Sequence, residues 1–98
     1  MALDELTLDS FSPHVGTVFV LRDADGDLSL TLAAADALPA PPGDRGRAPF
    51  SLEFDGPHEP VHPQDTVALE HEAMGHLEIF IVPIAQDADH TRYQAVFT

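Results

Sequence analysis

The sequence predicts an all-β fold, a single small antiparallel β-sandwich or partly closed barrel of about six strands with a short N-terminal helical turn. Three observations predict it. From residue 17 onward, apolar residues recur with a period of two, which is typical of half-buried strands. Turn-forming residues separate these stretches at short intervals. No segment between them is long enough for the helical crossover that parallel strands need, so the strands are expected to be antiparallel.

Length and composition are those of one domain. The chain has 98 residues, of which 44% are hydrophobic, and this is enough for a modest core. We therefore expect a single β domain over residues 1–98, with the helical turn at 7–15 and the strands within 17–98. The chain has no cysteine, which excludes disulfides, thiolate metal sites and cysteine nucleophiles.

The charge balance restricts the partners. Seventeen acidic residues against four basic ones give a formal net charge of -13. Nucleic-acid binding and attachment to an anionic membrane both need a basic surface, so neither partner is expected. No lysine is present for Schiff-base chemistry. A basic partner or a divalent cation would suit this charge, although acidic surfaces also serve simply to keep proteins in solution.

The segment 7–15 is the one helical candidate. Thr7 is a suitable N-cap, while Pro13 breaks the helical pattern and Gly16 ends it. We expect one or two turns, with Phe11 packing as a plug on the core.

The next strands are expected at 17–22 and 28–34, joined by the turn DADGD at 23–27. Within the second of them, four apolar residues on one face alternate with smaller residues on the other: Leu28, Leu30, Leu32 and Ala34. Four prolines and two glycines at 39–49 predict a loop.

The cleanest strand is 50–55, with Phe50, Leu52 and Phe54 facing in and Ser51, Glu53 and Asp55 facing out. A proline-rich connection follows at 56–64. The pattern then predicts strands at 66–72, 76–84 and 92–98. Gly75 supplies the residue that a tight turn or bulge requires. Pro83 cannot donate to a sheet, so a bulge or an edge is expected there.

Metal binding has one weak candidate site. His71 and His76 bracket the sequence HEAMGH, but their spacing of five and the intervening glycine do not fit the helical zinc-protease motif. A hairpin that brought His71 opposite His76, with Glu72 nearby, could still hold zinc or nickel. The alternative is that His71 ends a core face and His76 is solvated.

No catalytic constellation stands out. The serines lack a nucleophile elbow, no glycine-rich phosphate loop is present, and DADGD lacks the later glycine and glutamate of a calcium loop. We therefore expect no enzyme activity, no catalytic residues and no cofactor.

The chain has more apolar strand faces than one small core needs, and this is the main indication of its function. The stretch 77–84 is apolar on both faces, so either one face lies in an interface or a compact barrel covers both. The candidate interface residues are Ile79, Phe80, Ile81, Val82 and Ile84. They favour a protein partner or self-association.

The first residues carry neither a basic segment nor an apolar run, and the longest apolar stretch is too short to span a bilayer. The expected location is therefore the cytoplasm.

Three blocks together resemble a known family: LTLDSFSPHVG at 6–16, FSLEFDGP at 50–57, and LEHEAMGHLEIFIVPI at 69–84 followed by YQAVF. They are similar to a family of small bacterial all-β proteins known only as a domain of unknown function. The resemblance covers nearly the whole chain, rests mostly on core and turn residues, and supplies no catalytic residues. Glu72 stands where the family pattern would have a proline at the turn.

The resemblance further implies companionship with phage-tail-collar-like structural proteins. Together with the surplus apolar surface, it predicts a non-enzymatic structural or protein-binding module, an accessory or assembly subunit of a bacterial or phage-tail-like structure. The alternative is a small-ligand or metal-binding β domain that uses the His71–His76 hairpin.

Overall fold

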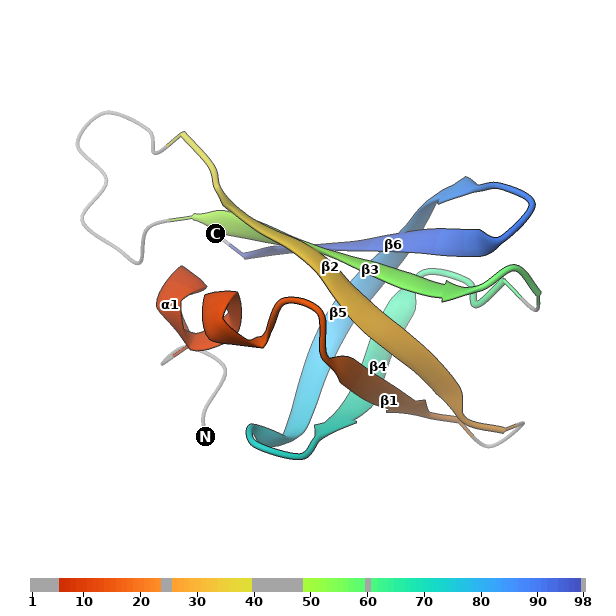
Figure 1. Cartoon of the computed structure of the whole chain (residues 1–98), viewed down its shortest axis with the longest axis horizontal. Helices are drawn as coiled ribbons and strands as arrows, with labels where there is room; N and C mark the ends of the chain where they lie inside the picture. The colour runs from red at the N-terminus through yellow and green to blue at the C-terminus, as the bar shows by residue number, and fades with distance from the viewer. Residues whose placement is uncertain (1–5, 24–25, 40–48, 60, 98) are drawn as a thin grey trace.

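The computed structural model describes residues 6–23, 26–39, 49–59 and 61–97. Six antiparallel strands close a barrel, and a short helical segment lies at one end of it (Figure 1), which confirms the predicted fold class. The elements in chain order are α1 (Leu8–Phe11), the 3-10 turn η2 (Ser12–His14), β1 (Val18–Arg22), β2 (Leu28–Ala37), β3 (Phe50–Pro57), β4 (Asp65–His71), β5 (Gly75–Gln86) and β6 (His90–Phe97).

Two three-stranded meanders, β1–β2–β3 and β4–β5–β6, build the wall of the barrel. The order around the barrel is β1-β2-β3-β6-β5-β4, and β4 returns to β1. Two pairings between distant parts of the sequence join the meanders: β3 pairs with β6 along its whole length, and β1 pairs with β4. Every neighbouring pair is antiparallel, as the short connections predict.

The long strand β5 changes partner along its length. Its first part, Gly75 to Ile81, pairs with β4, and its second part, Val82 to Gln86, pairs with β6. The register shifts between Pro83 and Ala85, which confirms the irregularity predicted at Pro83. A strand that is bulged and bent in this way can form a corner of a closed barrel.

A bulge in β2 changes the predicted alternation. The register with β3 shifts between Leu32 and Ala34, so that Ala35, and not Ala34, lies opposite the buried Leu52. Ala35 packs against the core instead. The prediction for Ala34 was wrong because a bulge inserts one residue and exchanges the two faces beyond it.

The predicted boundaries otherwise hold with small differences. β3 extends to Pro57, two residues into the connection predicted at 56–64. Ser51 lies on the outer side of β3, as expected, but is buried between its cross-strand neighbours Asp36 and Val96. The loop at 39–49 and the turn at 23–27 lie partly outside the described residues.

The N-terminal segment packs at one end of the barrel, as the sequence predicts. Thr7 is the N-cap of α1, and its backbone N–H donates to the Ser10 hydroxyl over 3.1 Å. Phe11 is fully buried, with its ring 6.5, 5.9 and 5.7 Å from those of Phe19, Phe50 and Phe97. The helical segment therefore acts as a plug, which joins the beginning of the chain to β1, β3 and β6.

Glycine allows the turn between this plug and β1. Gly16 has φ +92°, a backbone conformation that favours glycine. Its N–H donates to the Leu32 carbonyl over 2.7 Å, and the Leu32 N–H donates to the Thr17 carbonyl over 3.0 Å. These bonds tie the plug to β2. In the described part of the chain, no helix is long and apolar enough to cross a membrane.

Candidate functional site

The outer side of β5 carries a group of large apolar side chains that face solvent. Phe80 and Ile84 of β5 are 51% and 46% exposed, and Val96 of the neighbouring β6 is 54% exposed. Val82, which is partly buried, lies between Phe80 and Ile84 on β5. We call these four residues the β5 outer face.

Strand register explains why these residues share one side. Val82 pairs with Gln94 of β6. Phe80 and Val96 lie two residues away from this pair, each on the outer side of its own strand. At the bulge, Pro83 pairs with the buried Tyr93 and Ala85 pairs with Arg92, which leaves Ile84 as the extra, exposed residue. The alternation and the bulge together place three apolar side chains of one strand outside the barrel.

The structure divides the predicted interface residues into two sets. Ile79 and Ile81 lie in the core, so they are not available to a partner. Phe80, Val82 and Ile84 lie outside. The sequence could not choose between the two faces because both are apolar; the inward face turns out to be the one that carries Leu77, Ile79 and Ile81.

Polar and acidic groups border this face. Arg92 of β6 donates to both carboxylate oxygens of Asp55, over 2.8 and 3.1 Å, and to Glu53 over 3.4 Å. The same Arg92 and Asp55 side chains line a cavity of about 380 Å³, together with Ala85, Asp87 and His90. Backbone N–H groups of Asp89 and His90 bond the Asp87 carboxylate and lower its pKa. The border therefore keeps a negative charge, since two acids already neutralise Arg92.

The hairpin of β4 and β5 separates the proposed metal ligands. His71 pairs with Gly75, and His76 pairs with Glu70, so the two histidines are not opposite each other. The His71 side chain is buried inside the barrel, whereas His76 and Glu72 are exposed. The juxtaposition that a metal site at this hairpin requires is therefore not formed, and the structure agrees with the other reading, in which His71 ends a core face and His76 is solvated. Within the ranges that the structure describes, no three His, Cys, Asp or Glu residues are grouped so as to hold a metal ion.

His71 instead holds the plug and the hairpin turn together. Its Nδ1 accepts the backbone N–H groups of Ala73 and Met74, over 3.0 and 3.1 Å. Its Nε2 lies 2.9 Å from the Thr17 hydroxyl, which donates to the His14 carbonyl over 2.6 Å. Because Nδ1 is an acceptor, the proton is on Nε2, and this neutral form satisfies every one of these groups.

Burial lowers the pKa of His71, and the neighbouring His14 lowers it further, while Glu72 acts in the opposite direction. The His14 ring lies 4.7 Å from the His71 ring. Folding therefore favours the neutral imidazole. Protonation would put a second N–H at Nδ1, facing the two backbone N–H groups that it now accepts.

We expect the free energy of unfolding to decrease as the pH falls below about 6.5, the ordinary pKa of histidine in an unfolded chain. The stabilising effect of neutral His71 is complete above that pH and is lost toward the lowered pKa of the folded chain. Urea unfolding at several pH values between about 7.5 and about 5 measures this loss.

A matched pair of variants isolates His71 from the other titrating groups. In His71→Asn, the amide oxygen replaces Nδ1 as the acceptor and cannot be protonated in this range, so the pH dependence should become shallower. His76→Asn removes an exposed histidine from the same hairpin and should keep the wild-type dependence. Equal pH dependence in wild type and His71→Asn would contradict the role given to His71.

The end of the barrel opposite the N-terminal plug holds a pocket that could not be predicted from the sequence. Its volume is about 380 Å³, and it lies between the β1–β2 turn and the connection from β3 to β4. We call it the His62 pocket; its lining residues are Asp23, Gly26, Asp27, Leu28, Val61, His62 and Pro63.

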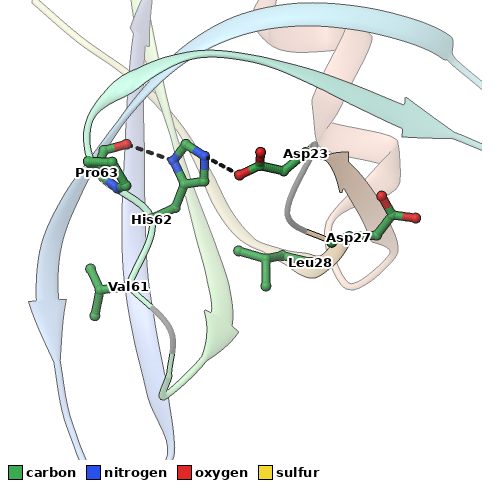
Figure 2. A pocket seen from close by; sticks show the side chains of 7 residues that line it. Asp23, Asp27, Leu28, Val61, His62 and Pro63 are labelled. Atoms are coloured by element: carbon green, nitrogen blue, oxygen red, sulfur yellow. Dashed lines mark hydrogen bonds and ion pairs between the residues drawn. The ribbon is translucent and has the colours of Figure 1, made fainter.

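His62 is the central residue of this pocket (Figure 2). Its Nδ1 lies 2.7 Å from the Pro63 carbonyl and its Nε2 lies 3.1 Å from the Asp23 carboxylate. Its backbone N–H donates to the hydroxyl of the buried Tyr93 over 2.9 Å. His62 thus links the β3–β4 connection to β6 and to the beginning of the β1–β2 turn. In the sequence, it stands among prolines with no pattern that points to Asp23, since the contact exists only after folding.

Comparison with known proteins places the chain without assigning an activity. A family model described as "Domain of unknown function (DUF6916)" matches residues 6–97. This range includes all three blocks that carry the resemblance seen in the sequence. Neither the curated proteins nor the solved structures contain a match to this chain.

Proposed function

The chain belongs to the DUF6916 family of domains of unknown function, and we propose that it is a non-enzymatic structural or protein-binding module that docks through the β5 outer face. The observation that carries this proposal is the group of exposed apolar side chains on neighbouring strands. Single exposed apolar residues are normal, but three large exposed apolar side chains on the outer side of two neighbouring strands, with polar residues beside them, are typical of an interaction site.

The composition of the site supports a heterologous partner more than a second copy. Phe80, Ile84 and Val96 supply an apolar centre, and Asp55, Glu53 and Asp87 supply an acidic border around Arg92. Interfaces commonly have an apolar core and a polar rim of this kind. Two copies, each with a net charge of -13, repel each other, whereas a partner with basic residues around an apolar patch is attracted.

The histidines support the non-enzymatic part of the proposal. His71 uses both ring nitrogens in hydrogen bonds that hold the fold, and His62 places both of its ring nitrogens against oxygen acceptors. Neither ring is free to act as a general base toward a substrate. We assign the module to the cytoplasm and to an accessory or assembly role in a bacterial or phage-tail-like structure, a role that the family resemblance favours.

Site-specific photo-crosslinking tests the proposed surface. A benzophenone amino acid is placed at Phe80 in one version of the chain and at Val15, exposed on the plug, in a control version. Each is irradiated in cells of the organism that encodes it. We expect a discrete product from position 80, containing one partner with a basic surface, and none from position 15.

The products also identify the alternatives. A product at twice the mass of the chain would support the β5 outer face as a docking surface but would show that the partner is a second copy of the chain. No product, or the same pattern from both positions, would overturn the proposal. Phe80→Glu, which alters only an exposed side chain, should abolish the partner product of a second probe at Ile84 while leaving the melting temperature close to that of wild type.

A further inference from the structure

The His62 pocket combines an apolar wall with two carboxylates, those of Asp23 and Asp27. Leu28, Val61 and Pro63 line one part of it, and the Asp23 side chain, which is 33% exposed, lies beside the His62 ring (Figure 2). Asp27 also lines the pocket, but its carboxylate bonds Arg22. A concave site of this size with few polar groups is suited to a small ligand or to one inserted side chain.

The donors of His62 and Gly26 at the pocket already have acceptors, which argues against an anionic ligand. The His62 ring faces the Pro63 carbonyl and Asp23, and its backbone N–H bonds Tyr93. The Gly26 N–H donates to the Asp23 carbonyl over 3.1 Å. Arg22, which precedes Asp23 in the chain, bonds Asp27 and Glu70 and does not line the pocket.

The remaining chemistry fits a cation with an apolar body. A carboxylate oxygen can take a further charged donor in addition to the His62 contact, because each oxygen accepts more than one hydrogen bond. The strongly negative chain attracts a cation, and the apolar wall can cover an alkyl chain behind it.

We propose that the His62 pocket binds an organic cation with an apolar stem, an alkylguanidinium or alkylammonium, with the charged head at Asp23 and the stem on Leu28, Val61 and Pro63. The cation is either a small molecule or the side chain of an arginine or lysine on a protein. This inference concerns a site separate from the β5 outer face and does not depend on it.

Titration followed by NMR tests the proposal on the full chain. The probes are butylguanidinium, butyrate and butanol, which share an alkyl stem and differ in the head group. We expect saturable shifts of the Leu28 and Val61 methyl signals with butylguanidinium and none with butyrate. Butanol should bind at least about tenfold more weakly, the factor that one charge-assisted hydrogen bond supplies. Equal binding of butanol, or no saturable shift with butylguanidinium, would overturn the proposal.

Two variants and one control locate the binding site. Asp23→Asn keeps an oxygen for His62 but removes the charge, and it should weaken butylguanidinium by about tenfold. Val61→Ala leaves the His62–Asp23 contact in place, shortens the apolar wall and should also weaken binding. Asp36→Asn makes the same charge change on an exposed residue of β2 and should leave binding unchanged. If Asp23→Asn and Asp36→Asn weakened butylguanidinium binding equally, the effect would come from net charge alone, and the proposed binding site at Asp23 would be wrong.

A peptide arm separates the two sources of the cation. A short capped peptide with one central arginine is compared with butylguanidinium at the same site. Tighter binding of the peptide indicates a protein side chain, and equal or weaker binding indicates a small organic cation. Both results support the pocket chemistry.

Discussion

Phe11→Ala will lower the free energy of unfolding by about 3–5 kcal/mol, the cost of removing a fully buried phenylalanine side chain. Phe11 is fully buried, and its ring contacts those of Phe19, Phe50 and Phe97. The aromatic rings that line this end of the barrel stand on three strands of a closed wall, so they cannot collapse freely into the space left behind. The loss is a large fraction of the stability of a domain of this size.

Urea denaturation measures this effect, and Phe80→Ala provides the matched control. Phe80 is the same residue type but is half exposed on the outer side of β5, so its deletion should cost less than about 1 kcal/mol. If Phe11→Ala leaves too little folded protein, Phe11→Leu gives a smaller change that can still be measured. Similar costs for the alanine substitutions at positions 11 and 80 would mean that the N-terminal segment does not act as a plug.

Gly56→Ala should destabilise the barrel by about 1–3 kcal/mol, because it adds a methyl group where the core has no room. A Cβ atom at this position would lie 2.7 Å from Leu30 Cδ2 and 3.1 Å from Tyr93 Cε2. Leu30 and Tyr93 are both fully buried. The steric conflict, and not the backbone angle, is therefore the reason for glycine here.

A double-mutant cycle separates this steric cause from a general loss of strand propensity. Leu30→Val removes the atom that the new methyl group would meet. In that background, Gly56→Ala should cost clearly less than in wild type, which gives a favourable coupling between the two sites. Additive costs would show that Leu30 is not the obstacle.

β3 was predictable because its apolar residues Phe50, Leu52 and Phe54 alternate strictly with polar ones. The bulge in β2 was not, since Ala33, Ala34 and Ala35 are small apolar residues on both faces and give no signal for the register. The pattern around Pro83 did predict an irregularity because proline lacks the N–H that a regular ladder needs.

The candidate sites were predictable only in part. The sequence of β5 shows two apolar faces, although a small core needs only one of them. Which face lies outside depends on how the barrel closes. Whether His71 and His76 lie on the same side of the sheet depends on the length of the turn between them. Because His71 pairs with Gly75, the two histidines lie on opposite sides of the sheet. His62 and Asp23 meet across the two halves of the chain, and no local pattern encodes such a contact.

The two pairings that join the meanders have a consequence for the order of folding. Phe50 pairs with Phe97 and Val20 pairs with Glu70, so closing the ring brings together segments that are far apart in the chain. During synthesis on the ribosome, the first meander emerges before the strands that pair with its two outer strands. The outer edge of β3 has no partner until β6, the last strand, has been made. The barrel should therefore form late and in one cooperative step, with a rate limited by the entropy of loop closure.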